Sequence, residues 1–187
     1  MKRLLHNTQV LTIPNIMSMF RIALLPVIAW LYIGRNDIPS AIMLLIISGI
    51  SDILDGFIAR KYNMVSDFGK VIDPIADKLT QGVLLICLAV KYNIIFWLVG
   101  IFAVKEILMF LMGLIVFKKK ASVNSAKWYG KLNTIIIYFT IVFLIIIPDI
   151  PLVVVNAIIF ICMFALLASF ILYAKFYAKI LKSKEPS

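Results

Sequence analysis

Long apolar runs separated by short polar segments make up most of this chain, and they restrict the folds open to it. Apolar side chains account for 63% of the sequence, and the mean hydropathy is +1.05. An ordinary soluble domain is only about half apolar, which excludes that class. Runs of about twenty apolar residues are long enough to cross a bilayer as helices. The sequence therefore predicts an all-α integral membrane protein.

The apolar runs predict six transmembrane helices. The expected boundaries are 14–34, 38–60, 73–90, 94–117, 132–147 and 152–173. The fifth run is short, so we expect that helix to start within the polar segment 121–134. Pro148 and Pro151 predict a tight turn before the last helix, because neither proline fits a helix interior. No internal repeat and no linker interrupts the pattern, which predicts a single membrane domain over residues 1–187.

Basic residues are distributed unevenly between the two sides of this predicted topology. One side carries the N-terminal segment 1–12, the loop 60–70, the segment 118–131 and the tail 175–187. The opposite side has only Arg35 and Lys91. Since Lys and Arg are retained on the cytoplasmic side, both termini are expected in the cytoplasm of a multi-pass protein of the cell membrane. The net charge of +10 is then explained by topology and by anionic lipid headgroups, and it requires no nucleic-acid partner.

Four aspartates lie close together at the cytoplasmic border of the second and third helices. The array is Asp52-x-x-Asp55-Gly56-x-x-Ala59-Arg60, then eight residues, then Gly69-x-x-x-Asp73-x-x-x-Asp77. Carboxylates this close to hydrocarbon are costly, so their presence indicates a use. Each pair is spaced three or four positions apart and projects from one helix face. Two such faces turned toward each other form an all-oxygen pocket, which two Mg²⁺ or Mn²⁺ ions would neutralise, and such a metal site indicates phosphate chemistry.

The array resembles the signature of the CDP-alcohol phosphatidyltransferase family, D-x-x-D-G-x-x-A-R-x8-G-x-x-x-D-x-x-x-D, at every specified position. The likeness includes Ile13-Pro14-Asn15 and Gly130-Lys131, and it covers roughly residues 11–175. The resemblance implies six helices around a cytoplasm-facing polar cavity, commonly in a homodimer. It also implies transfer of a phosphatidyl group from CDP-diacylglycerol to an alcohol, with release of CMP. A non-enzymatic ion carrier or scaffold is the alternative from another class, and the complete signature argues against it.

The resemblance implies roles for individual residues. Asp52, Asp55 and Asp73 match the metal-ligand positions of the family. Asp77 matches a position that contacts a metal ion and acts as general base on the acceptor hydroxyl. The positions that bind CDP-diacylglycerol correspond to Asn15, Ser18, Gly56, Arg60 and Ser66.

The acceptor alcohol is indicated by the basic residues. A phosphate-bearing acceptor requires cations near the metal site, and Lys78, Lys105 and Lys131 are the candidates. The chain most resembles the phosphatidylglycerophosphate synthase branch, whose acceptor is glycerol 3-phosphate. That branch usually has Arg before Glu106 and a lysine in place of Asn133, and this chain departs from both. The second departure resembles the cardiolipin synthases of the same superfamily, whose acceptor is phosphatidylglycerol, so that lipid is the main alternative. Serine and inositol phosphate are the remaining possible acceptors.

Three further basic features have open roles. Arg21 could extend to the membrane interface as an anchor. Lys105 could simply pair with Glu106 inside the fourth helix. The run Lys118–Lys120 is best explained as a solvated positive anchor at the cytoplasmic side, although a substrate role was the alternative.

Overall fold

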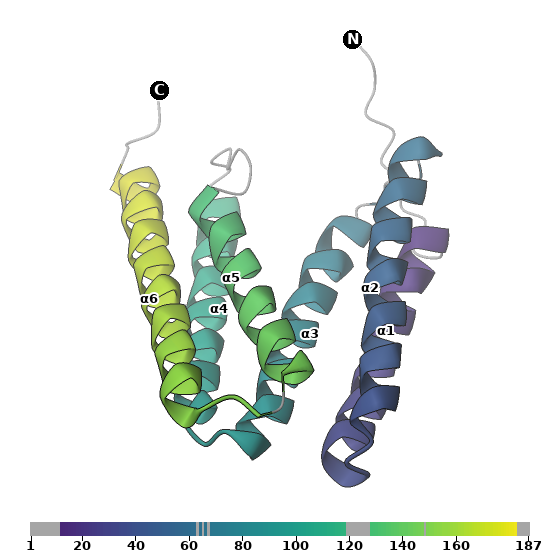
Figure 1. The fold of residues 1–187 in the computed structure, drawn as a ribbon. Coiled ribbons are helices and arrows are strands. Elements are labelled where there is room, and N and C mark those ends of the chain that lie inside the picture. Colours follow the sequence, from purple (N-terminus) through teal and green to yellow (C-terminus); the bar gives the residue numbers. More distant parts are fainter. Residues whose placement is uncertain are drawn as a thin grey trace, which may run out of the picture. The chain divides into compact units, whose positions relative to one another are not determined.

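The computed structural model describes residues 12–62, 64, 66, 68–118, 128–147 and 149–182. All regular secondary structure in these ranges is helical, as the apolar runs predicted (Figure 1). The helices are α1 (Ile13–Ala29), the π-helical segment η1 (Trp30–Gly34), α2 (Ile38–Lys61), α3 (Gly69–Lys91), α4 (Ile95–Lys118), α5 (Trp128–Ile146) and α6 (Leu152–Lys182). The start of α5 lies within the polar segment where it was expected.

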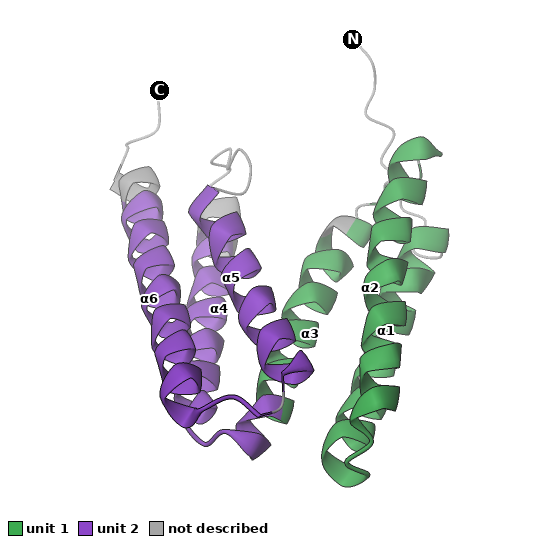
Figure 2. Ribbon diagram, in the orientation of Figure 1, with its two compact units in different colours: residues 1–87 green, residues 88–187 purple. Residues whose placement is uncertain are grey.

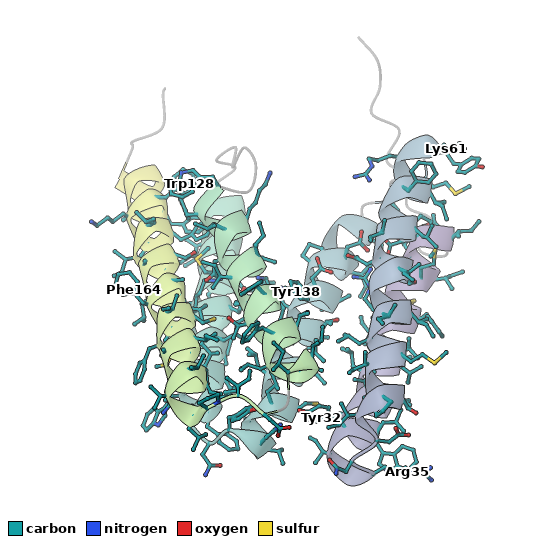
Figure 3. All side chains as sticks on the ribbon, viewed as in Figure 1. Tyr32, Arg35, Lys61, Trp128, Tyr138 and Phe164 are labelled. Atoms are coloured by element: carbon teal, nitrogen blue, oxygen red, sulfur yellow. The ribbon has the colours of Figure 1, made fainter. Side chains whose placement is uncertain are left out.

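Among the described helices, five are long and apolar enough to cross a membrane, namely α1 with η1, α2, α4, α5 and α6. The chain is therefore a multi-pass membrane protein. Its outward faces are apolar: the Phe164 side chain on α6, for example, is 74% exposed and projects from the helix (Figure 3). Helix α3 is not among the five, and its first half carries Asp73, Asp77 and Lys78. A sixth span through α3 stays a prediction.

The turn between α1 and α2 shows how the sequence sets helix ends. Pro26 lies inside α1 and has no backbone N–H to donate, and the helix continues as the wider η1 turn to Gly34. Asn36 adopts a left-handed conformation with φ of 53°, which asparagine tolerates better than most residues. Asp37 caps α2, because its carboxylate accepts a hydrogen bond from the Ser40 backbone N–H at 3.2 Å. The hydrogen bonds from Ser40 hold the pKa of the Asp37 carboxyl below its usual range.

The chain divides into two compact units, residues 1–87 and residues 88–187 (Figure 2). In the first unit, α1 and α2 form an antiparallel pair whose helices pack along each other. In the second unit, α6 packs against both α4 and α5. The single domain expected from the sequence stays a prediction.

The second unit is held together by apolar stripes. The stripe on α6 consists of Val155, Ile159, Cys162 and Leu166, each fully buried. Their separations of four, three and four positions place them on one face of the helix. Helix α5 buries Ile137 and Ile141 in the same way. Because the remaining faces are also apolar, these helices can present buried side chains to one another and exposed ones to lipid.

The first unit has two chemically different ends. Arg35 precedes α2 and Lys61 is its last residue, so the two lie at opposite ends of the helix (Figure 3). Asp52 and Asp55 are near the Lys61 end, roughly 9 to 14 Å from it along the helix axis. Asp73 lies four positions after the start of α3. The signature aspartates therefore gather where α2 ends and α3 begins.

Candidate active site

Arg21 of α1 lies among carboxylates from two other helices. Its Nη1 donates a hydrogen bond to Asp77 Oδ1 of α3 at 2.7 Å, and its Nη2 donates to Asp55 Oδ2 of α2 at 2.6 Å. Nη1 also forms an ion pair with Asp52 Oδ1 of α2. Arg21 is only 3% exposed, so it does not extend to the membrane interface. One guanidinium thus connects α1 to both helices that carry the signature.

Ser18, one turn before Arg21, connects the same three helices. Its hydroxyl lies 2.6 Å from Asp73 Oδ1 of α3 and 3.3 Å from Asp55 Oδ2 of α2. It also lies 3.1 Å from the backbone oxygen of Pro14. Since a hydroxyl has one proton, it can donate to only one of these oxygens at a time. The shortest distance identifies Asp73 as the favoured acceptor.

The two acidic helix faces therefore meet, as the spacing of the aspartates predicted. We call Asp52, Asp55, Asp73 and Asp77 the aspartate cluster. The Asp52 and Asp77 side chains are 47% and 43% exposed, whereas that of Asp55 is 6% exposed. The cluster is closed on the side of Arg21 and open on the side of Asp52 and Asp77.

The donor chemistry of the aspartate cluster suits hard divalent cations. When ionised, four carboxylates and one guanidinium leave three negative charges uncompensated, and oxygen-only donors are those that Mg²⁺ and Mn²⁺ prefer. The arrangement is not that of a preformed metal site. Within the described ranges, no three His, Cys, Asp or Glu side chains are arranged to hold a metal ion. The Arg21 nitrogens lie between the carboxylates instead.

Asn15 and Ser66, both predicted to bind the nucleotide, contact each other. The Asn15 amide nitrogen lies 2.9 Å from Ser66 Oγ, and Ser66 Oγ lies 3.1 Å from Asn15 Oδ1. Ser66 Oγ also accepts a hydrogen bond from the Gly69 backbone N–H at 2.9 Å, which caps the start of α3. Both residues are almost fully buried. This pair fixes the start of α3 against α1 and so helps to place Asp73.

Gly56 and Arg60 follow the aspartates on α2. A Cβ at Gly56 would meet only Arg60 Nη2, at 3.8 Å, so the space in front of this glycine is open. The missing side chain would let a ligand approach the helix backbone. Arg60 is exposed, and its planar guanidinium is suited to phosphate oxygens. A nucleotide role for both residues stays a prediction.

The three lysines predicted to bind the acceptor occupy different places. Lys78 follows Asp77 on α3, is half-buried, and its charge acts on the Asp77 carboxylate. Lys105 and Lys131 belong to the second unit. Lys105 is 5% exposed and pairs with Glu106 at 2.6 Å, while Lys131 is exposed in the first turn of α5. The Lys105–Glu106 pairing is one of the two alternatives that the sequence left open for Lys105, and the acceptor role of all three lysines stays a prediction. The side chain of Lys118, together with Lys119 and Lys120, lies outside what the structure describes.

The Gly130-Lys131-x-x-Thr134 stretch has a structural role within the second unit. A Cβ at Gly130 would overlap the hydroxyl of Tyr173 on α6 and lie 3.0 Å from its Cζ. Thr134 Oγ1 donates to the Gly130 carbonyl at 3.2 Å. Asn133 is 2% exposed, and neither its amide nitrogen nor its amide oxygen has a hydrogen-bond partner among the described residues. The glycine is thus explained by close helix packing, and the buried amide is the unusual feature of this stretch.

No role in the site was predicted for Arg21, although its spacing from Asn15 and Ser18 and its charge both indicate one. Asn15, Ser18 and Arg21 recur every three positions and therefore share one face of α1. Asn15 and Ser18 were already assigned to the site on that face. A buried arginine also requires carboxylate partners, and the signature supplies four. The face and the charge together would have placed Arg21 in the aspartate cluster.

The fold and the site together define a multi-pass helical membrane protein with an acidic cluster shared by three helices. Residues 11–174 match the model of the family described as CDP-alcohol phosphatidyltransferase. The chain belongs to this family, and the match extends over both compact units.

Individual relatives differ in the activity that their names state. A CDP-diacylglycerol--glycerol-3-phosphate 3-phosphatidyltransferase of Rickettsia typhi is 43% identical over 84 residues, which cover 44% of this chain and 47% of the relative. A chloroplastic protein of Oryza sativa with the same activity in its name is 40% identical over 118 residues, 63% of this chain and 35% of the relative. A cardiolipin synthase (CMP-forming) of Streptomyces coelicolor is 36% identical over 112 residues, which cover 57% of this chain and 52% of the relative. The chain thus spans about half or less of the length of these curated relatives.

Proposed function

We propose that this protein transfers the phosphatidyl group of CDP-diacylglycerol to glycerol 3-phosphate, giving phosphatidylglycerophosphate and CMP. The observation that carries the proposal is the aspartate cluster, in which α2 and α3 bring four carboxylates together beside apolar helices. The family match and the names of the Rickettsia and Oryza relatives support the same reaction. Carboxylates close to hydrocarbon are costly and therefore indicate a function, and phospholipid synthesis is a function that takes place at the membrane border.

The aspartate cluster would hold Mg²⁺ or Mn²⁺, as a pair of ions, through Asp52, Asp55, Asp73 and Asp77. When bound, these ions would neutralise negative charge on the diphosphate of the substrate. The open side of the cluster, next to Asp52 and Asp77, leaves room for a phosphate-bearing ligand.

Asp77 is the proposed general base. It removes the proton of the acceptor hydroxyl, and the resulting oxygen attacks the phosphorus that carries diacylglycerol. The bond between this phosphorus and the oxygen of CMP breaks, and CMP leaves with the electron pair. The partial exposure of the Asp77 side chain gives an acceptor access to its carboxylate.

CDP-diacylglycerol would be bound by residues that line the approach to the cluster. Arg60 supplies a planar cation for phosphate oxygens, and Gly56 leaves the helix backbone accessible. Ser18, Asn15 and Ser66 would hold the nucleotide from α1 and from the start of α3. Asn15 and Ser66 are hydrogen-bonded to each other, and the Ser18 hydroxyl donates to Asp73, which supports a preorganised site.

Lys78, Lys105 and Lys131 would bind the phosphate of glycerol 3-phosphate. The second candidate acceptor is phosphatidylglycerol, which would make the protein a cardiolipin synthase. Asn133 favours this alternative, because the glycerol 3-phosphate branch usually has lysine there. The likeness to the Streptomyces cardiolipin synthase is a further reason to test it.

The distribution of Lys and Arg supports a cell-membrane location with both termini and the aspartate cluster on the cytoplasmic side. Water-soluble glycerol 3-phosphate and CMP would then be exchanged with the cytoplasm. We also propose a homodimer, six spanning helices and a polar cavity open to the cytoplasm, as the family resemblance implies. Crosslinking in native membranes would test the dimer.

The direct test incubates the purified protein with CDP-diacylglycerol, Mg²⁺ or Mn²⁺, and glycerol 3-phosphate, phosphatidylglycerol, serine or inositol phosphate. We expect phosphatidylglycerophosphate and an equal amount of CMP from the first acceptor only. If cardiolipin forms from phosphatidylglycerol and no other acceptor reacts, the proposed acceptor is wrong, but the proposed phosphatidyl transfer stands. Ion flux in proteoliposomes, with no CMP from any acceptor, would instead establish the carrier alternative.

A further inference from the structure

Arg21 occupies the space that a cation bound by the aspartate cluster would need. Its two terminal nitrogens contact Asp52, Asp55 and Asp77, which are three of the four proposed metal ligands. A guanidinium and a divalent cation repel each other, so their simultaneous contact with the same carboxylate oxygens is unfavourable. We propose that Arg21 is an internal counter-ion, which fills the aspartate cluster in the metal-free protein and withdraws from it when divalent cations bind. This inference rests on the proposed metal site.

The metal-free cluster needs such a counter-ion. Asp55 is almost fully buried and lies in contact with the Arg21 guanidinium, and a buried carboxylate requires a cationic partner. Arg21 provides a permanent positive charge from α1, and its contacts hold α1 against α2 and α3. Without it, α2 and α3 would bring four carboxylates together, and the Ser18 hydroxyl that contacts two of them carries no charge to balance them.

The contacts of Arg21 also suit a group that can leave. A buried arginine with a purely structural role is expected to have all its donors satisfied. Here Nη1 and Nη2 are engaged, whereas Nε is buried and has no hydrogen-bond partner among the described residues. Among the described residues, the guanidinium is held by the carboxylates that a cation would bind. When a cation binds these carboxylates, the Arg21 guanidinium loses both its hydrogen-bond partners and the negative charge that stabilises it there.

The direction in which removal of Arg21 changes the affinity for metal ions distinguishes a counter-ion from a structural support. Removing a structural arginine would disturb the carboxylates and weaken metal binding. Removing a competing arginine would strengthen metal binding and weaken the metal-free fold. Binding of Mn²⁺ to the purified full chain in detergent, without substrate, is measured by the electron paramagnetic resonance signal of free Mn²⁺, and the metal-free melting temperature is measured alongside.

Arg21→Gln should bind Mn²⁺ more tightly than the wild type, by at least about tenfold, because binding no longer has to break the ion pairs of Arg21, and even one such pair at contact distance in bulk water is worth about that factor. Its metal-free melting temperature should fall, and Mn²⁺ should restore it. Arg21→Lys should bind Mn²⁺ more tightly by a smaller factor, since one ammonium competes at fewer points. Arg35→Gln removes the same charge at the other end of α2, where Arg35 stacks on Trp30, and should leave Mn²⁺ affinity unchanged.

Equal or weaker Mn²⁺ binding by folded Arg21→Gln, next to a wild type that binds Mn²⁺, would overturn the counter-ion inference and leave the proposed function intact. If Arg21→Gln cannot be purified, equal or weaker binding by Arg21→Lys has the same consequence. Failure of both the wild type and Arg21→Gln to bind Mn²⁺ would overturn the metal site and the inference together.

Discussion

Gly69 and Asn15 approach each other so closely that a larger residue at position 69 would displace the Asn15 side chain. A Cβ there would lie 2.7 Å from Asn15 Oδ1 and 3.1 Å from Ser66 Oγ. The signature glycine therefore permits the hydrogen-bonded contact between α1 and the start of α3. That contact in turn sets the position of the first turns of α3, where Asp73 and Asp77 lie. The glycine of the signature acts on the site through packing.

Gly69→Ala should destabilise the protein by about 1–3 kcal/mol, the usual cost of inserting a methyl group into a packed site. Chemical unfolding in detergent, followed by circular dichroism, would measure the loss. Gly49→Ala is the matched control, because a Cβ at Gly49 meets nothing within 4 Å. A Gly69→Ala variant as stable as this control would show that the close contact with Asn15 does not contribute to the stability of the protein.

Gly130→Ala should destabilise the second unit by a similar amount, about 1–3 kcal/mol, since the new methyl group would overlap the Tyr173 side chain. Tyr173 is confined by an edge-to-face contact with Tyr129 at 4.5 Å between ring centroids, so it has little room to move. Gly100→Ala in α4 meets nothing within 4 Å and should instead be neutral or stabilising. Reversal of this order in thermal unfolding would contradict the packing account of Gly130.

Asp77→Asn should reduce phosphatidyl transfer by two or more orders of magnitude, because an amide cannot accept the acceptor proton, and general-base catalysis typically contributes about that factor. Binding of CDP-diacylglycerol should persist, since three aspartates remain in the cluster. Single-turnover CMP release and equilibrium binding of the nucleotide lipid would separate the two steps. Near-normal transfer would show that Asp77 is not the base.

Lys131→Ala and Lys105→Ala should raise the acceptor KM more than the KM for CDP-diacylglycerol. Loss of a charge-assisted contact typically costs about 1.5–3 kcal/mol, or roughly ten- to a hundredfold in affinity. Lys91→Ala, at the far end of α3, removes the same charge and serves as the control. Equal effects on both KM values would argue against a dedicated acceptor site at these lysines.

The aspartate cluster could be predicted from the sequence because it depends on helix periodicity. The spacing of Asp52 with Asp55, and of Asp73 with Asp77, places each pair on one helix face. Because contact between carboxylates and lipid is costly, these two acidic faces are expected to turn toward each other. The position of Arg21 could not be read from periodicity alone. It depends on how α1 rotates against α2 and α3, which is decided by packing.

Helix ends were predicted less well than helix positions. Helix α3 begins at Gly69, four residues before the expected start, because the Ser66 hydroxyl caps it by accepting from the Gly69 N–H. Helix α6 continues to Lys182, well past the expected end near Tyr173. The expected end marked the limit of the apolar run, and a helix does not have to stop where the membrane does.

We propose that phosphatidyl transfer depends on the aspartate cluster and on the divalent cations that the cluster would hold. The most direct measurement is release of labelled CMP from CDP-diacylglycerol and glycerol 3-phosphate by the wild type and by the Asn variants of Asp52, Asp55 and Asp73, with Mg²⁺ or with excess chelator. The amide lacks the charge needed to hold a hard cation, so we expect release by the wild type with Mg²⁺ and nearly none from the chelated wild type or from the variants. Full turnover in excess chelator, or wild-type turnover by Asp55→Asn, would contradict the account.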